Sequence, residues 1–531
     1  MFSYKKRITA VFLCLLMLMA VCSVRIATIA TDEKLSEVAI GQSTRTVTVT
    51  STRGTIYDCF GLPLTNAATE PVTVIFPSEQ GAVVLSEMCE GEELLEKREL
   101  LMQGSPIIIK GTSPQSLGAI TLQVPKRYSG ALSHVIGYTD GTNHGVSGLE
   151  KGLDNILFNQ KGITVSYKTD SLGRMLQGEG YEVDMNKTAD SIKLTIDFEI
   201  QQIVEAATES VGRGAAVVVE AESGKIKAMV SRPDFDQNDI SQSLSDEQSP
   251  LINRALYTYN VGSVFKPTVA AAALSTENEN YVYNCKGSIF SGGLTFKCHK
   301  LSGHGEMDMK TALAESCNTY FYTLSQKIGA ESLLSQAEAF RFGTSLDLGG
   351  GINTVKGTLP DLNTLSNSSA ALINFSIGQG EIMLSPVAMS MLYSAIVSGG
   401  VYRMPTVIEG ITQNGEYKQN EAFLPTRAMS KVTADALKKY LKNALQNGTG
   451  SEAFIDGISA GGKTGTAQTG WKDGNRSILN GWFCGFVETE ITEYVVIILK
   501  EDVKSGSYDC APIFKNISQY IFELDVKRIR E

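Results

Sequence analysis

A serine and a lysine three residues apart, Ser263 and Lys266, open an apolar run that continues from Val269 to Leu274. If a helix begins here, both side chains lie on one face within hydrogen-bonding reach, as a nucleophile and its base require. A lysine is a base at neutral pH only if its pKa falls from about 10.4 to near 7. That change costs roughly 4 kcal/mol, which burial beside a second cation can supply. The alternative is a helix cap with a solvated lysine.

A second pair combines a hydroxyl and a carboxamide, Ser316 and Asn318, just before the apolar residues Tyr320, Phe321 and Leu324. From a short loop both side chains can point into a cleft, where the hydroxyl relays a proton and the amide binds a peptide. An ordinary polar turn or helix cap is the alternative.

A third motif, Lys463-Thr464-Gly465-Thr466, follows two glycines. On an extended segment, the lysine and the two hydroxyls can hold a substrate carboxylate while backbone N–H groups bind a developing oxyanion.

The same stretch matches two competing patterns, the phosphate loop over 457–464 (GISAGGKT) and the esterase nucleophile elbow over 457–461 (GISAG). Both patterns require a helix directly afterwards. The residues that follow include three glycines within ten positions and predict no helix, which disfavours both interpretations.

Composition narrows the class of protein. The chain has 531 residues, 43% of them apolar and 20% charged, with a net charge of −10. These values predict several folded domains and argue against a disordered chain and against a nucleic-acid binder. Nine cysteines are too few for a disulfide scaffold, and the four histidines include no pair at metal-ligand spacing on one helix, so we expect no His-rich metal site.

The N-terminus predicts export. Lys5, Lys6 and Arg7 precede an apolar run over residues 8–24, and the following segment is mixed in charge. This pattern predicts a cytoplasmic tail (1–7), a single transmembrane anchor (8–24) and an extracytoplasmic remainder, with a cleaved signal peptide as the alternative. An oxidising compartment without ATP also disfavours the phosphate loop.

Two regions follow the anchor. Residues 25–188 are β-rich and turn-punctuated, with strands expected near 47–50, 72–76 and 107–109. Residues 189–531 open with a strand near Ile192, a helix over 199–209 and a hairpin formed by 215–220 and 225–230. Helices over 263–274, 309–328 and 385–397 then precede central strands over 481–487 and 494–499. Strands at both ends and helices between them predict an α/β (α+β) fold, a sheet covered by helices.

The three motifs occur in the order Ser-x-x-Lys, Ser-x-Asn, Lys-Thr-Gly, each on a suitable element, which is the constellation of serine acyl-transferases acting on penicillin and D-alanyl peptides. Over most of its length the chain resembles the class B, monofunctional penicillin-binding proteins. Further segments carry the likeness: 53–61 (RGTIYDCFG), 148–150 (GLE), Asn253-Arg254, His304-Gly305, 377–380 (IGQG) and 511–514. The pattern departs from the family at Val261, where proline is usual, and at Cys59, where arginine is usual.

The resemblance implies a serine β-lactamase/transpeptidase-like domain over 189–531 and a pedestal or dimerisation-like domain over 25–188. It implies that Ser263 attacks the carbonyl of a D-Ala-D-Ala bond, Lys266 accepts its proton and Ser316 passes a proton to the leaving amine. It further implies the roles of the remaining site residues: Asn318 bonds the peptide or Lys266, Lys463 supplies positive field, Thr464 and Thr466 hold the carboxylate, and the N–H groups of Ser263 and Thr466 form the oxyanion hole.

The expected activity is therefore a D,D-transpeptidase that cross-links peptidoglycan stem peptides, is acylated by β-lactams, and needs no metal or organic cofactor. A membrane glycan polymerase, or division or elongation proteins, are the partners that the resemblance implies. The alternatives are a β-lactamase, a D,D-carboxypeptidase, or a catalytically silent scaffold of wall synthesis.

Cys285 and Cys298 lie 13 residues apart, outside the membrane and before the second motif. They could form a disulfide whose redox state regulates access to the cleft, or remain two small buried thiols.

Overall fold

The computed structural model describes residues 2–32, 34, 43–115, 117–176, 178, 180–185, 190–276 and 278–531. It divides the chain into two compact units. The first comprises Met1–Arg53, Ala67–Arg127 and Asn159–Thr188, and the second Gly54–Asn66, Tyr128–Phe158 and Ala189–Glu531. The last division falls between Thr188 and Ala189, and two segments from within 25–188 belong to the second unit. Those segments include most of the RGTIYDCFG motif and all of the GLE motif.

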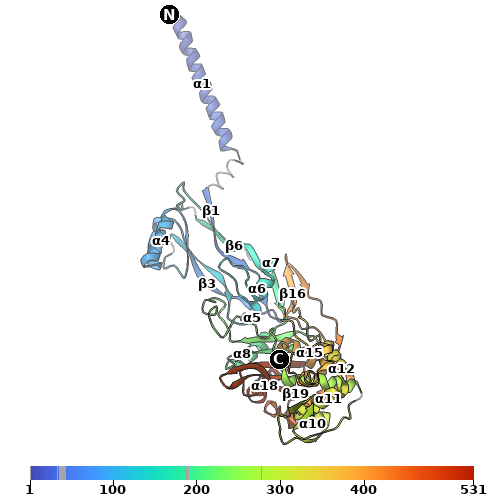
Figure 1. Ribbon diagram of the computed structural model, residues 1–531. Helices are drawn as coiled ribbons and strands as arrows, with labels where there is room; N and C mark the ends of the chain where they lie inside the picture. Colours follow the sequence, from blue (N-terminus) through green and yellow to red (C-terminus); the bar gives the residue numbers. More distant parts are fainter. Residues whose placement is uncertain are drawn as a thin grey trace. The chain divides into compact units, whose positions relative to one another are not determined.

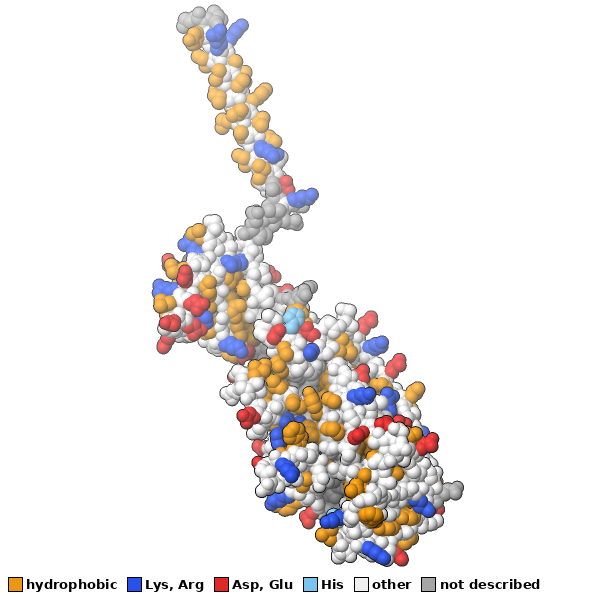
Figure 2. Space-filling view, viewed as in Figure 1, with side chains coloured by type: hydrophobic (Ala, Val, Ile, Leu, Met, Phe, Trp, Pro, Cys, Tyr) orange, Lys and Arg blue, Asp and Glu red, His pale blue; other side chains and the backbone are white. Residues whose placement is uncertain are grey.

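The chain begins with helix α1 (Phe2–Ala30), of which Tyr4–Ala30 is apolar and long enough to cross a membrane. At 1.5 Å per residue its 27 residues extend about 40 Å, more than a bilayer's hydrocarbon core. Figure 2 shows apolar side chains along the helix, with basic side chains near its ends. Within the described residues it is the one helix of this kind, and it is longer than the predicted span 8–24.

The first unit is built on two three-stranded sheets. One has the order β1-β6-β7 (Thr44–Arg53, Phe158–Lys168, Tyr181–Asp184), and the other β4-β3-β5 (Ile107–Lys110, Thr65–Ile75, Ala119–Tyr128). Helices α3 (Glu79–Met88) and α4 (Gly91–Met102) accompany them. Alternate residues such as Val72, Val74 and Phe76 form the core, so the strands predicted from the sequence are present.

A five-stranded antiparallel sheet forms the centre of the second unit, in the order β10-β9-β21-β20-β19. The strands span Ile226–Arg232, Gly214–Glu220, Glu493–Glu501, Arg476–Glu488 and Ala460–Asp473. The predicted hairpin is β9–β10, and the two strands predicted to be central lie in the interior. The two edge strands, β10 and β19, come from opposite ends of the region.

Both faces of this sheet are covered, which explains why its strands read as continuous apolar runs. Val217 and Val219 face a core shared with helices α9 (Lys266–Ser275) and α15 (Pro386–Val397). Ala216 and Val218 face the opposite core, which contains residues of α8 (Phe198–Ala207) and α18 (Ala511–Arg530). Figure 1 shows α8 and α18 lying together on this second side.

A smaller sheet has the order β17-β16-β8-β2 (Glu416–Gln419, Ile408–Gln413, Ser191–Leu194, Thr55–Tyr57). Strand β2 pairs in parallel with β8, which accounts for the RGTIYDCFG segment packing with the second unit. Short strand pairs β11–β14 (Tyr283–Cys285, Gly305–Met307) and β12–β13 (Ser288–Ser291, Leu294–Lys297) precede the second motif.

The helix predicted over 309–328 is instead two helices, α10 (Met309–Ala314) and α11 (Asn318–Ile328). The break falls at Ser316, whose φ of +54° lies in the left-handed region. A helix cannot continue through that conformation, and for a residue with a Cβ it costs about 1–2 kcal/mol. The interruption leaves Ser316 between the two helices, with Cys317 as the N-cap and Asn318 as the first residue of α11.

Candidate active site

The start of helix α9 positions the first motif. Residues Gly262–Phe265 form one turn of 3₁₀ helix, and the backbone N–H of Lys266 donates to the Ser263 carbonyl. Side chains at i and i+3 of such a turn eclipse one another, so Ser263 and Lys266 share one face. Ser263 is half-buried, whereas Lys266 is fully buried. Ser263 and Lys266 therefore lie three residues apart on one face at the start of a helix, as their spacing predicts.

The 316–318 loop holds the lysine. Lys266 Nζ lies 2.8 Å from the Ser316 carbonyl oxygen, 3.1 Å from Ser316 Oγ and 2.8 Å from Asn318 Oδ1. It also lies 5.4 Å from the centre of the Phe321 ring. Among the described residues the Ser263 hydroxyl makes no hydrogen bond, so its proton is uncommitted. Burial lowers the pKa of Lys266 to about 7, against the raising effect of Cys317 and Cys298.

Edge strand β19 supplies the third motif. Lys463 is fully buried; its Nζ donates to the Thr464 carbonyl at 3.2 Å and to Thr449 Oγ1 at 3.3 Å. Thr449 Oγ1 in turn lies 3.0 Å from Thr464 Oγ1. Two effects lower the pKa of Lys463: desolvation by burial is the larger, and the positive charge of Lys266 is the smaller.

The end of this motif is open to solvent. Thr466 is exposed, and its Oγ1 accepts a hydrogen bond from the Gly506 backbone N–H at 3.0 Å. After Thr466, strand β19 continues to Asp473, so no helix follows the glycines. The phosphate-loop and nucleophile-elbow interpretations therefore lack the element that they require.

Glycines bring the first and third motifs together. A Cβ on Gly465 would lie 3.0 Å from the Val261 carbonyl oxygen, and one on Gly262 would lie 3.0 Å from that of Thr466. Gly378, in the IGQG segment, accepts a hydrogen bond from the Gly262 N–H at 2.8 Å. A Cβ on Gly378 would lie 2.0 Å from the Gly262 carbonyl oxygen. This close backbone approach explains why these positions are glycine.

The structure thus gathers two buried lysines, three hydroxyls (Ser263, Ser316 and Thr464), an amide and an exposed threonine from the three motifs into one region. Thr449 and Ser507 were not predicted as part of the site. Thr449 Oγ1 accepts a hydrogen bond from Lys463 Nζ, and Ser507 Oγ donates to the Thr449 carbonyl at 2.9 Å. Both residues are single hydroxyls outside any motif, so the sequence offered no signal for them.

A second group of side chains was also missed. Cys285, Cys298, His304 and Cys317 present their sulfur and nitrogen atoms within 4.8 Å of one another. Cys285 and Cys298 are both buried free thiols, as in the second of the two alternatives predicted for them, and His304 and Cys317 lie beside them. The four residues are separated by 13, 6 and 13 positions, and these spacings match no short metal-binding motif, so no local pattern predicts the group.

Comparisons with known proteins agree with this geometry. Residues 214–519 match the family model "Penicillin binding protein transpeptidase domain". The chain is 30% identical over 423 residues to Stage V sporulation protein D of Bacillus subtilis, covering 75% of this chain and 63% of that relative. It is 28% identical over 461 residues to the penicillin-binding protein PbpB of Mycolicibacterium smegmatis, covering 78% of this chain and 69% of that one.

Solved structures share the fold. The D,D-transpeptidase domain of an Eggerthella lenta peptidoglycan glycosyltransferase aligns with a TM-score of 0.66 and 25% identity, covering 90% of this chain and 99% of that one. Penicillin-binding protein 3 of Mycobacterium tuberculosis, complexed with ampicillin, aligns with a TM-score of 0.66 and 22% identity, covering 91% and 96%. Because the family model matches more than half of the chain and lies over all three motifs, this chain belongs to the class B penicillin-binding proteins.

Proposed function

We propose that this protein is a serine D,D-transpeptidase that cross-links peptidoglycan stem peptides through an acyl-enzyme and is acylated by β-lactams. The observation that carries the proposal is the buried Lys266, one turn from Ser263, with a pKa near 7. A neutral lysine beside an uncommitted serine hydroxyl is a nucleophile with its base.

The proton path follows from the contacts of Lys266. A neutral amine keeps two N–H groups, which match the Ser316 carbonyl and Asn318 Oδ1, and one lone pair. In the proposed first step, Ser263 Oγ attacks the carbonyl of the terminal D-Ala-D-Ala bond and its proton passes to that lone pair. The resulting ammonium has three N–H groups for its three oxygen neighbours, Ser316 Oγ included. Ser316 then relays the proton to the amine of the departing D-alanine. The C–N bond breaks, D-alanine is released, and the acyl group stays on Ser263 as the acyl-enzyme.

The substrate ends in a carboxylate, which a cation and hydroxyl groups can bind. We assign the terminal carboxylate to Thr464 and Thr466, with Lys463 supplying positive field, and the oxyanion to the N–H groups of Ser263 and Thr466. Gly465 keeps strand β19 close to the serine turn. An amine of a second stem peptide would then attack the acyl-enzyme, form the cross-link and release Ser263.

The test uses the full chain in detergent, fluorescent penicillin and intact-mass detection over hours, with Ser263→Ala as the control. We expect a stable adduct that Ser263→Ala lacks. Rapid turnover of the adduct would indicate a β-lactamase, and no adduct on folded protein would indicate a silent scaffold. Supplying a D-Ala-D-Ala peptide with and without an amine acceptor separates transpeptidation, which yields a joined product, from carboxypeptidation, which yields only free D-alanine.

The apolar helix α1 supports a single-pass membrane protein with residues 1–7 in the cytoplasm and the catalytic unit outside. Protease added to intact spheroplasts should degrade the catalytic unit, whereas a cytoplasmic orientation would protect it. A membrane glycan polymerase is the partner class proposed on family resemblance, and co-purification of the full chain with that class of enzyme tests it.

A further inference from the structure

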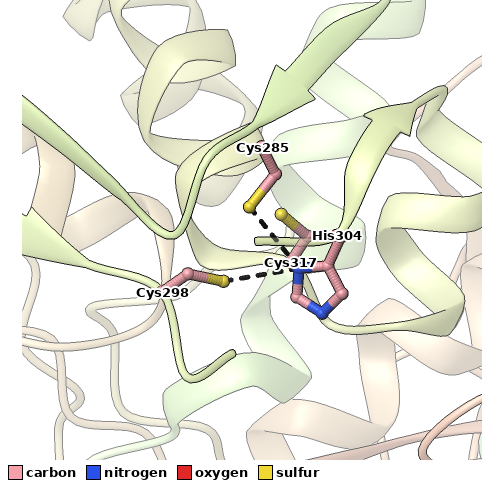
Figure 3. A group of neighbouring side chains, drawn as sticks. All are labelled: Cys285, Cys298, His304 and Cys317. Carbon is pink, nitrogen blue, oxygen red and sulfur yellow. Dashed lines mark hydrogen bonds between the residues drawn. The ribbon is translucent and has the colours of Figure 1, made fainter. Parts of the chain in front are cut away.

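We propose that Cys285, Cys298, His304 and Cys317 form a structural zinc site that fixes the 316–318 loop of the active site. Figure 3 shows the four side chains converging on one point from three parts of the chain, with His304 Nδ1 turned toward the sulfurs. The cysteine side chains are 2%, 2% and 0% exposed. Three thiols and one imidazole, with no carboxylate, form the soft ligand set typical of structural zinc.

The distances fit a tetrahedral ion. With Zn–S near 2.3 Å and Zn–N near 2.05 Å, a tetrahedral site has S···N edges of about 3.6 Å. The observed distances from His304 Nδ1 are 3.5 Å to Cys285 Sγ and 3.6 Å to Cys298 Sγ. All four donor atoms lie within 4.8 Å of one another. The apparent hydrogen bonds around Nδ1 therefore have the lengths of the edges of a zinc tetrahedron.

Surrounding groups are arranged to stabilise negatively charged sulfur. Thr319 Oγ1 donates to Cys285 Sγ at 3.0 Å. Backbone N–H groups of Lys300 and Asn318 point to Cys298. Hydrogen bonds of this kind hold the ligands of metal sites in place. On the far side of the imidazole, the buried His304 Nε2 has no partner among the described residues, so the sulfur side determines the position of the ring.

The segment 282–306 needs such an anchor. It is built on two nested antiparallel strand pairs, with β12–β13 lying between β11 and β14, and its only buried apolar side chains are Cys285 and Cys298, while Phe290, Leu294 and Leu301 are exposed. A segment of this length without a core of its own is held by few apolar contacts, and a metal can take the place of a core.

The fourth ligand connects the site to catalysis. Cys317 lies between Ser316, which is held at a left-handed φ, and Asn318, and both of these neighbours hold Lys266. A bond from Cys317 to the metal would keep the strained loop in this conformation. Four protein ligands leave no open coordination position, so the ion would position residues rather than react with substrate.

The proposal makes different predictions from those of a disulfide. A disulfide between Cys285 and Cys298 would remove two hydrogens and leave Cys317 as a lone thiol, whereas zinc binding displaces three thiol protons and protects all three sulfurs from oxidation outside the cell.

The test is the metal content of the full chain, purified in detergent with a phosphine reductant, exposed to zinc and then freed of unbound ion. We expect about one zinc per chain, with Cys285, Cys298 and Cys317 resisting alkylation until a chelator is added. The double variant Cys285→Ser/Cys298→Ser should lose at least four-fifths of the zinc. The matched variant Cys14→Ser/Cys22→Ser, which removes two thiols from α1, should keep it.

Several results would overturn the proposal: no zinc in the wild type, zinc retained in the double variant, or a Cys285–Cys298 disulfide in protein purified without reductant. The wild-type alkylation pattern decides the matter even if the double variant fails to fold. Because metal content is measured without penicillin or peptide, this outcome is independent of the proposed transpeptidase activity.

Discussion

In the proposed mechanism, Lys266 is the base that accepts the proton of Ser263. Burial lowers the pKa of Lys266 to about 7, so its amine is neutral, and able to accept a proton, in a larger fraction of molecules as pH rises through 7. We therefore expect the rate constant for acylation by penicillin to rise with pH, with a midpoint near 7, and then to level off. Stopped-flow acylation between pH 5.5 and 9 measures it, and a rate independent of pH would contradict the role of Lys266 as base.

The same residue can be tuned through Asn318. The substitution Asn318→Asp places a carboxylate about where Oδ1 now lies, 2.8 Å from Nζ, and so favours the ammonium form. We expect the midpoint of the acylation profile to move to higher pH by about one to two pH units. Asn318→Ala removes the same hydrogen bond without adding charge and should slow acylation without that displacement. Equal profiles for the two variants would show that Asn318 acts only on the substrate.

At the scale of elements, the contact between the serine turn and the IGQG segment determines where helix α9 begins. Gly378→Ala would place a Cβ 2.0 Å from the Gly262 carbonyl oxygen, which neither backbone can avoid without moving. We expect a loss of stability on the order of 2–4 kcal/mol and acylation at least tenfold slower.

Gly380→Ala is the matched control for this contact. Gly380 also has a positive φ, but the nearest atom to its Cβ would be that of Asn374 at 3.6 Å. Only the backbone penalty, about 1 kcal/mol, remains. Thermal unfolding and acylation of both variants separate the two costs, and equal losses would contradict the steric account.

The elements also show what the sequence could and could not predict. The helical repeat of apolar residues predicted α8 and α15, and continuous apolar runs predicted the β9–β10 hairpin and the interior strands. The local sequence pattern and burial determine each of these elements. The break at Ser316 was not predicted, since the 309–328 segment keeps a helical pattern and tertiary contacts impose the left-handed residue. Local spacing predicted Ser263 with Lys266, and the order of the motifs predicted their convergence. The Cys285–Cys298–His304–Cys317 group was not predicted, because its ligands come together only through the short hairpins.

At the scale of the molecule, the two ends of the catalytic region are joined. Arg528, near the end of α18, donates to both carboxylate oxygens of Asp197 at 2.6 and 2.9 Å, and Asp197 is 1% exposed and caps helix α8. Arg528→Ala leaves a buried carboxylate without its cation, so we expect a loss of stability of about 2–3 kcal/mol. Lys527→Ala removes an exposed ion pair with Glu531 and should cost less than 1 kcal/mol. Denaturant unfolding compares the two, and similar small losses would show that α18 is held by packing alone.

The order of strands in the central sheet has a consequence for the timing of biogenesis. Strand β9 pairs on its inner edge with β21, and the paired residues Glu220 and Tyr494 are 274 residues apart in the chain. At about 5–20 residues per second of synthesis, the apolar β9–β10 hairpin waits roughly 15–55 seconds for that partner. During this interval the inner edge of β9 is unpaired, and an unpaired strand edge is prone to aggregation. We therefore expect the fraction of this protein that folds to depend on how fast the C-terminal third is synthesised, and not on final stability alone.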